Sequence, residues 1–276
     1  TRRSSDLVFH ASMKDWRLIY IIFAKSEDKL YISNKNRQAY FVLLSVCIIF
    51  VRINLKNCNV MFDKETYVQR RALLKKNIGS GVLLFLGNDE QGLNYEDNAF
   101  RYRQDSTFLY YFGLSFAGLS AIIDIDEDKE IIFGDELTID HIVWMGTQPT
   151  LKEKSERVGI RETLPSVAII SYLHKAVQKG QTVHYLPPYR PEHKLKLMDW
   201  LGIPPARQEG SVPFIRAVVA QRNYKSAEEI AEIEKACDVT ADMHIKAMEV
   251  IRPGMYEYEV VAEMNRVAEM RSEERR

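Results

Sequence analysis

The sequence predicts an α/β domain, a mixed β-sheet flanked by helices, followed by the first helices of a second unit. Three observations carry this prediction. Short apolar runs bounded by glycines or prolines alternate with longer segments of helical period. One pair of runs is separated by a short acidic turn, which is typical of a hairpin. The composition then changes near Tyr224, where a long helical pattern without strands begins.

The domain opens with a helix and a buried strand. In residues 61–81, "MFDKETYVQRRALLKKNIGSG", Asp63 is a suitable N-cap and Gly79 a suitable stop signal. Residues 81–87, "GVLLFLG", form a short apolar run between glycines, which predicts a buried strand. The aromatic run "TFLYYFGL", residues 107–114, predicts a further strand.

A hairpin follows. Residues 121–125 and 130–133 predict its two strands, and "DEDK" predicts its turn. The acidic residues from Asp124 onward superficially match the start of an EF-hand calcium loop. That loop needs glycine at its sixth position and glutamate at its twelfth, where this chain has Lys129 and Asp135. The strand-like flanks therefore favour a solvated hairpin turn.

Two helices and a strand complete the domain. Residues 165–181 predict a helix that stops at Gly180, because apolar residues recur at four-residue spacing: Ile169, Leu173 and Val177. Residues 182–188, "TVHYLPP", predict a strand that is ended by prolines. Residues 192–202, "EHKLKLMDWLG", predict the last helix of the domain.

The second unit begins with one long helix. Ser226 and Glu229 have the spacing of a capping box, and Pro253-Gly254 ends the helix before another one starts. Its apolar residues make a single stripe: Ile230, Ile233, Cys237, Ala241, Ile245 and Met248. We expect Ile233, Ile245 and Met248 of this stripe to be exposed or covered by another chain, because no sheet for them to pack on is recognisable in this unit.

The first sixty residues do not match the rest. They hold two apolar runs, residues 18–24 and 39–51, and the longer has 13 residues, short of the roughly 20 needed to span a bilayer. A signal-peptide core, an edge strand or buried helix, and non-native or upstream-translated sequence are open alternatives. We expect three parts: a non-native or unstructured extension at 1–60, the α/β domain at 61–223, and the second unit at 224–276.

Charge and cysteine content argue against several classes of protein. The chain has 38 Lys and Arg against 38 Asp and Glu, a formal net charge of zero, which argues against a nucleic-acid partner. The cysteines Cys47, Cys58 and Cys237 are odd in number and form no CxxC motif. They favour a reducing compartment, the cytoplasm, over a disulfide framework or a zinc knuckle. We expect no membrane partner.

Motifs alone predict no reaction. The sequence has no HExxH, GxSxG, Walker or GxGxxG motif. Two arginines beside tyrosines in "FRYRQDS", residues 100–106, could bind an anion or pair with carboxylates. Trp144 in "DHIVWMG" has two interpretations, a core aromatic or the wall of a binding pocket.

Three segments in this order and spacing resemble the Xaa-Pro aminopeptidases, also called aminopeptidase P. They are "YRQDSTFLYYFGL", "HIVWMG" and "YKSAEEIAEIEKACDVTADMHIKAMEVIRPGMYEYEV". The resemblance covers residues 61–268 and does not include residues 1–60. Each segment alone is less specific, because prolidases and creatinases share the helix that leads to Arg-Pro-Gly.

The resemblance implies a creatinase-like amino-terminal domain followed by the start of a pita-bread catalytic domain. It implies hydrolysis of the bond between an N-terminal residue and proline by two divalent ions, usually manganese. It also implies peptide substrates with proline in second position and assembly into a homo-oligomer. Trp144 corresponds to a family tryptophan that lines the substrate pocket, in its own subunit or a neighbouring one.

The chain departs from the family at the metal site. The family's metal ligands follow the position of Pro253-Gly254, and no Asp, His or Glu of this chain matches one of them. We therefore expect a fragment truncated before the active site, with no catalytic or metal-binding residue and doubtful activity by itself. A non-catalytic module for oligomerisation or partner binding, and a prolidase-like or creatinase-like relative, remain the alternatives.

Overall fold

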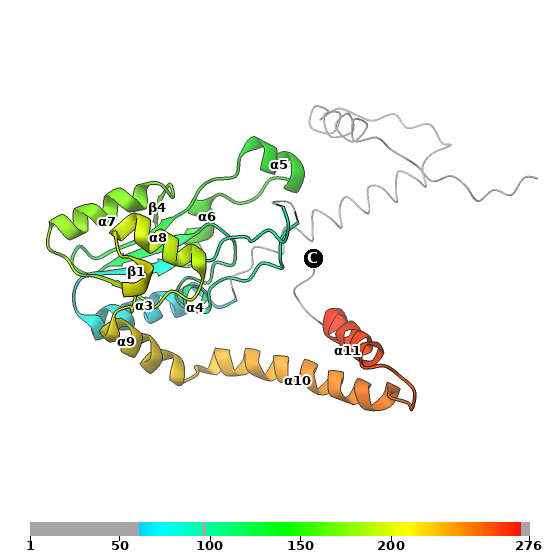
Figure 1. The fold of residues 1–276 in the computed structure, drawn as a ribbon. Helices are drawn as coiled ribbons and strands as arrows, with labels where there is room; N and C mark the ends of the chain where they lie inside the picture. The colour runs from blue at the N-terminus through cyan, green and yellow to red at the C-terminus, as the bar shows by residue number, and fades with distance from the viewer. Residues whose placement is uncertain (1–60, 96–97, 272–276) are drawn as a thin grey trace, which may run out of the picture. The chain divides into compact units, whose positions relative to one another are not determined.

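A computed structural model describes residues 61–95 and 98–271, so the predictions for residues 1–60 lie outside the described residues (Figure 1). The described part is a mixed α/β fold, as predicted. Its elements are α3 (Lys64–Ile78), β1 (Val82–Leu86), α4 (Ser106–Phe112), β2 (Ser120–Asp124), β3 (Lys129–Phe133), α5 (Ile139–Met145), α6 (Leu151–Glu156), β4 (Glu162–Leu164), α7 (Ala168–Gln178), β5 (Val183–Tyr185), α8 (Pro191–Leu201), the 3-10 helix η1 (Pro205–Arg207), α9 (Val212–Asn223), α10 (Ala227–Val250) and α11 (Glu257–Arg271).

The sheet has five strands in the order β4-β3-β2-β1-β5. β2 pairs antiparallel with both β1 and β3, with Ile122 opposite Leu84 and Ile131. The pairing with β3 confirms the predicted hairpin. The short edge strands pair parallel, β5 with β1 and β4 with β3. The sheet is therefore mixed.

Helices cover both faces of the sheet, and β1 contributes to both cores. Leu83 and Phe85 point into one cluster of buried residues, which includes residues of α3, α4 and α9. Val82 and Leu84 point to the opposite face and pack with residues of α7 and α8. The alternation follows from the two-residue side-chain period of a strand, and a strand buried on both faces is apolar throughout.

One strand prediction is wrong. Residues 106–112 form helix α4, because Asp105 caps the helix with hydrogen bonds from the Thr107 and Phe108 amides, both at 2.9 Å. Gly113 then ends the helix in the left-handed conformation at φ 63°. The aromatic side chains Phe108, Tyr111 and Phe112 are buried in the core, so their burial depends on a helical period and not on a strand period.

The helices predicted from cap and stop signals are confirmed. α3 begins after Asp63 and ends at Gly79. In α7 the buried apolar residues are Ile169, Leu173 and Ala176, whereas Val177 is exposed, so the four-residue spacing was correct only for the first two.

The long helix α10 also begins as predicted. Ser226 and Glu229 form both hydrogen bonds of a capping box. Arg70 of α3 lies 3.5 Å from Glu229 and stacks 4.0 Å from the ring centroid of Tyr110. The predicted apolar stripe is exposed at Ile230, Ile233, Ile245 and Met248. No helix among the described residues is long and apolar enough to cross a membrane.

Candidate functional site

Four strands end at the same edge of the sheet. β1 and β3 both run opposite to β2, while β5 runs with β1 and β4 with β3. The carboxyl ends of β1, β3, β4 and β5 therefore meet at one edge, together with the loops that follow them. In α/β proteins such a carboxyl edge is a frequent place for binding sites.

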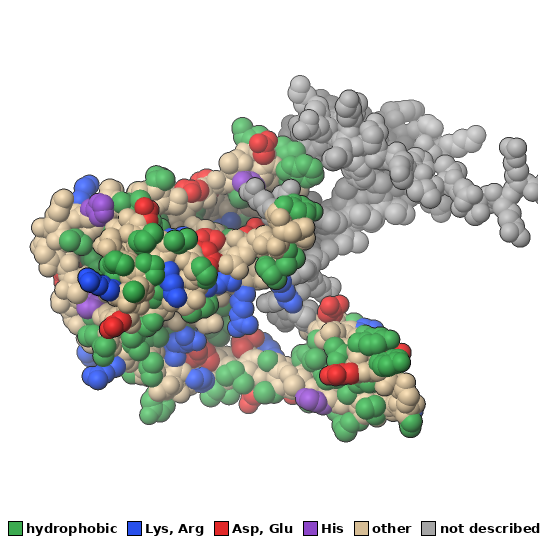
Figure 2. All heavy atoms as spheres, in the orientation of Figure 1, with side chains coloured by type: hydrophobic (Ala, Val, Ile, Leu, Met, Phe, Trp, Pro, Cys, Tyr) green, Lys and Arg blue, Asp and Glu red, His purple; other side chains and the backbone are tan. Residues whose placement is uncertain are grey.

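Helix α5, in the loop after β3, brings Trp144 to this edge. Thr138 caps the helix by accepting a hydrogen bond from the His141 amide, and Gly146 ends it. The Trp144 side chain is 77% exposed, and Ile139 and Val143 beside it are 80% and 54% exposed. Figure 2 shows hydrophobic side chains gathered over α5. The core interpretation of Trp144 is therefore wrong, and its role in substrate binding stays a prediction.

The loop after β1 adds further exposed apolar side chains to the same edge. A bridge between Gly92 and Ala99 closes this loop. Leu93, Tyr95 and Phe100 are each more than half exposed. Two separate loops thus present apolar and aromatic groups at one end of the sheet, a composition suited to peptide contacts.

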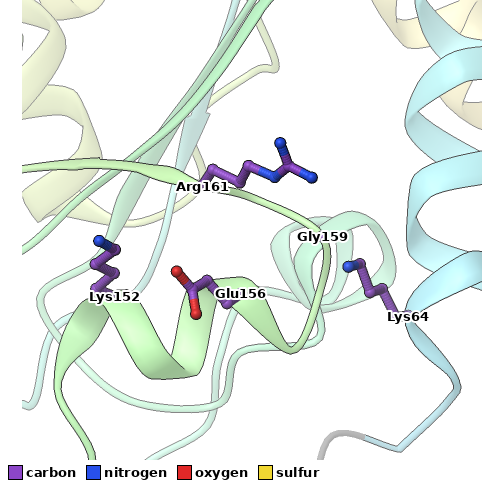
Figure 3. A pocket seen from close by; sticks show the side chains of 5 residues that line it. All are labelled: Lys64, Lys152, Glu156, Gly159 and Arg161. Atoms are coloured by element: carbon purple, nitrogen blue, oxygen red, sulfur yellow. The ribbon is translucent and has the colours of Figure 1, made fainter.

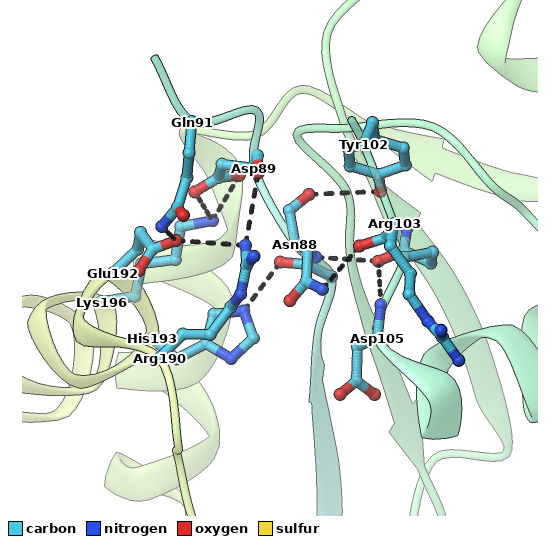
Figure 4. A network of polar contacts seen from close by, with 12 residues as sticks. Asn88, Asp89, Gln91, Tyr102, Arg103, Asp105, Arg190, Glu192, His193 and Lys196 are labelled. Carbon is cyan, nitrogen blue, oxygen red and sulfur yellow. Dashed lines mark hydrogen bonds and ion pairs between the residues drawn. The ribbon is translucent and has the colours of Figure 1, made fainter. Parts of the chain in front are cut away.

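A polar network fixes the loop after β1 against the start of α8 (Figure 4). Lys196 lies 2.7 Å from an Asp89 carboxylate oxygen, and Arg190 lies 3.2 Å from Glu192. Gln91 donates a hydrogen bond to the same Glu192 carboxylate. The two segments are about a hundred residues apart in sequence, so the network holds the edge together by tertiary contacts.

The segment of residues 100–106 forms the other side of this network. Gln104 is buried and accepts a hydrogen bond from the Asn88 amide at 2.8 Å, and the Asn88 side chain donates to the Arg103 carbonyl at 2.8 Å. The Tyr102 hydroxyl donates to the Asn88 carbonyl at 3.4 Å, and burial raises the pKa of Tyr102. These contacts shape the loop, and they do not decide between anion binding and carboxylate pairing for its two arginines.

His193 of α8 supports the same region through a contact with the backbone at the end of β1. It is 4% exposed, and its Nε2 donates to the Gly87 carbonyl at the end of β1, 3.0 Å away. Burial lowers the pKa of His193, because a charged imidazole would lose its hydration there. A neutral ring in this position holds α8 against β1.

The described residues do not fit a dinuclear metal centre. Among residues 61–95 and 98–271, no three His, Cys, Asp or Glu side chains are grouped so that they could hold an ion. Glu259 and Glu263 share a face of α11, but Glu259 accepts a hydrogen bond from the Tyr256 amide and Glu263 pairs with Arg266. We therefore derive no catalytic step through a metal for this part of the chain.

Sequence reasoning singled out Trp144, whose role stays a prediction, and missed the polar groups of the edge. Asn88, Asp89, Arg190 and His193 match no motif, because their partners lie far away along the chain. The one local signal was position, since Asn88 and Asp89 directly follow the apolar run of β1.

The chain is similar to known proline-specific peptidases. It is 28% identical over 186 residues to a probable Xaa-Pro aminopeptidase of Chaetomium globosum, covering 66% of this chain and 30% of that protein. It is 25% identical over 216 residues to the Xaa-Pro aminopeptidase of Escherichia coli, covering 74% of this chain and 48% of that protein. The human Xaa-Pro dipeptidase is 23% identical over 192 residues, covering 68% of this chain and 38% of that protein.

Solved structures agree with the fold. The aminopeptidase PepP of Pseudomonas aeruginosa aligns with a TM-score of 0.66 at 25% identity, covering 78% of this chain and 50% of that one. Zinc-substituted E. coli aminopeptidase P in complex with product aligns with a TM-score of 0.60 at 23% identity, covering 75% of this chain and 49% of that one. The chain thus spans half or less of the length of these relatives.

The remaining comparison identifies the domain itself. Residues 67–185, which run from within helix α3 to the end of β5, match the family model described as aminopeptidase P, N-terminal domain. This segment holds the whole five-stranded sheet and the loops that follow β1, β3 and β4 at its carboxyl edge. The α/β domain of this chain is therefore similar to the N-terminal domains of aminopeptidase P, in its sequence over residues 67–185 and in its fold.

Proposed function

We propose that this chain supplies the N-terminal domain and the first catalytic-unit helices of an Xaa-Pro aminopeptidase. Such an enzyme hydrolyses the bond between an N-terminal residue and a proline in second position. The observation that carries the proposal is the length of the similarity. The alignment with the E. coli enzyme covers 216 residues, well beyond the domain matched at residues 67–185.

The carboxyl edge is the part of this chain that we assign to substrate handling. Trp144 and the aromatic residues of the loop after β1 offer flat apolar surface, which suits a proline ring. The polar network around Asp89 and Glu192 keeps the loop in one conformation, so that less entropy is lost when a peptide binds.

In this proposal, the metal ions are bound only by the complete enzyme. We propose two divalent ions, manganese in the native state, held by residues other than those described here. The zinc-substituted form of the E. coli relative supports a metal-dependent reaction for that protein. We further propose that the chain by itself neither holds manganese nor hydrolyses peptides.

Location and assembly are also proposals. A free and exposed Cys237 is compatible with a reducing cytoplasm. The exposed apolar residues of α5 and α10 support assembly into a homo-oligomer when the enzyme is complete. The zero net charge supports the expectation that the partner is not a nucleic acid.

A chimera tests the proposed activity. Residues 61–271 would replace the aligned part of the E. coli enzyme, and hydrolysis of a tripeptide with proline in second position would be measured. The intact E. coli enzyme and its remaining part alone are the controls. We expect proline-specific hydrolysis above that of the remaining part alone. A folded, metal-loaded chimera without this gain would contradict the proposal.

The same chimera separates the alternatives. The similarity to the human Xaa-Pro dipeptidase favours a prolidase-like relative as second candidate. That candidate predicts cleavage of Xaa-Pro dipeptides in preference to longer peptides. If the chain is a non-catalytic module, it should bind a partner, and residues 61–271 should add no activity to the chimera.

A further inference from the structure

A basic pocket lies away from the carboxyl-edge site, between the start of α3 and the α6–β4 connection (Figure 3). It is lined by Lys64, Lys152, Glu156, Gly159 and Arg161, and its volume is about 370 Å³. This volume falls within the usual range for small-molecule sites, about 300–1,000 Å³. The cations come from three separate segments of the chain, so the pocket is assembled by the fold.

The cations of the pocket lack carboxylate partners. Within the part of the chain that the structure describes, neither Lys64 nor Lys152 nor Arg161 forms an ion pair or a side-chain hydrogen bond. Four other lysines of the same domain do form ion pairs: Lys75, Lys129, Lys179 and Lys196. In Figure 3 Arg161 and Lys64 extend toward one another, while Lys152 and Glu156 rise from the same side of α6. Three positive charges against one negative charge leave the pocket with an excess of positive charge, which attracts anions.

The walls of the pocket are held rigidly by buried groups. Lys64, Val68 and Arg71 lie on one face of α3, since they are spaced by four and three residues. The fully buried Arg71 donates to the Val158 carbonyl at 2.9 Å, directly beside Gly159. A Cβ atom on Gly159 would lie 2.5 Å from Val68 Cγ2 and 3.4 Å from Lys64 Cε.

Gly159 thus permits a close approach that places the Lys64 side chain at the pocket. Its φ of 83° lies in the left-handed region, which favours glycine. The approach does not depend on a ligand, because Arg71 secures it. The backbone at Gly159 is therefore in place before a ligand binds, so the entropy lost on binding is mainly that of the cationic side chains.

We propose that this pocket binds a small, multiply charged phosphorylated molecule. A single carboxylate would engage one cation, whereas linked phosphate groups can reach several cations at once. Glu156 restricts which ligands fit, because its negative charge repels a phosphate group placed beside it. It therefore favours ligands that carry a hydroxyl or amino group at that end. The proposal is independent of the proposed peptidase activity.

Calorimetric titration of the full chain with inorganic pyrophosphate tests the proposal. We expect saturable binding at one site, weaker at an ionic strength of about 150 mM than at about 20 mM. Lys152→Gln and Arg161→Gln should each weaken binding by about three- to tenfold. Glu156→Gln should tighten it by about two- to threefold. All three positions are exposed, so the variants should fold normally.

Lys76→Gln is the matched control, since Lys76 is an exposed lysine on α3 outside the pocket. It should leave pyrophosphate binding unchanged. Absence of saturable binding at low ionic strength would overturn the proposal, and so would an equal loss of affinity in Lys76→Gln, which would indicate non-specific attraction. Sulfate is the comparison ligand, because it is a single tetrahedral anion without a second linked group. Equal affinity for sulfate and pyrophosphate would also overturn the proposal.

Discussion

The guanidinium of Arg71 is fully buried and donates from Nε to a carboxylate oxygen of Glu130 at 2.7 Å, joining helix α3 to strand β3. Its other nitrogens donate to the carbonyls of Tyr111 and Val158, each at 2.9 Å. Burial lowers the pKa of Arg71, and Glu130 opposes that shift. One side chain thus satisfies acceptors from three distant segments.

Replacing this arginine should destabilise the domain strongly. Arg71→Met removes the donor to two buried carbonyls and to one Glu130 oxygen, so that Glu130 keeps only Lys75, 3.2 Å from its other oxygen. Loss of one partner of a buried pair costs about 3–5 kcal/mol. We expect a loss of that size in the free energy of unfolding, measured in urea. Lys76→Met, on the exposed side of α3, is the control. A loss under about 1 kcal/mol for Arg71→Met would contradict the role assigned to it.

Two glycines with positive φ allow a matched comparison. Gly113 has φ 63°, and a Cβ atom there would lie 2.4 Å from Tyr67 Cζ, whereas Gly118 has φ 75° and open space around it. Gly118→Ala should cost about 1–2 kcal/mol for the left-handed backbone alone. Gly113→Ala should cost about 1–3 kcal/mol more, because the buried Tyr67 ring must move. Equal thermal shifts for the two variants would argue against this crowding.

Trp144→Ala should affect substrate handling more than stability. Because the side chain is 77% exposed, we expect the free energy of unfolding to change by less than about 0.5 kcal/mol. In the chimera, KM for a proline-containing tripeptide should rise, or kcat/KM should fall. Val167→Ala, at an equally exposed apolar residue before α7, is the control. Unchanged kinetics for Trp144→Ala would exclude it from the substrate site.

His193 should make the stability of the domain depend on pH. Burial lowers its pKa in the folded chain, so the unfolded chain binds a proton more readily. Stability should therefore be complete above about pH 6.5 and decrease as the pH falls toward the lowered pKa of the folded state. His193→Asn should flatten this part of the stability profile, measured by urea unfolding between about pH 7 and pH 5. His174→Asn, at an exposed position on α7, controls for the loss of a histidine.

The chain should not retain manganese. A dinuclear site needs several convergent carboxylates and a histidine, and the described residues contain no such group. After incubation with manganese and gel filtration, we expect metal far below one ion per chain and no hydrolysis of an Xaa-Pro peptide. Near-stoichiometric metal, with turnover that a chelator abolishes, would refute this expectation.

Local signals were enough to predict the helices α3, α7, α8 and α10 and the central hairpin, but not α5, α6 or α9. Caps and stops such as Asp63, Gly79 and the Ser226–Glu229 capping box act within a few residues, so their effect can be read from short segments. The pattern of two apolar runs joined by an acidic turn, which marks β2 and β3, is equally local. These elements formed where they were expected.

The errors have physical causes. The aromatic run of residues 107–114 was assigned to a strand from its composition, but Asp105 and Gly113 bound a helix there, and end signals outweigh propensity in so short a segment. Strand β4 has three residues and depends on parallel pairing with β3, so no sequence pattern marks it. The polar network of the carboxyl edge depends on contacts between residues about a hundred positions apart, which a single sequence does not reveal.

The sheet order has a consequence for synthesis of the protein. β1 lies between β2, which follows within about 40 residues, and β5, which follows only after about 100 residues. While the ribosome translates the intervening stretch, at about 5–20 residues per second, the nascent apolar strand VLLFL lacks its second neighbour for roughly 5–20 s. An unpaired strand edge of this kind is a template for wrong pairing between chains, which chaperones on the emerging polypeptide would have to prevent.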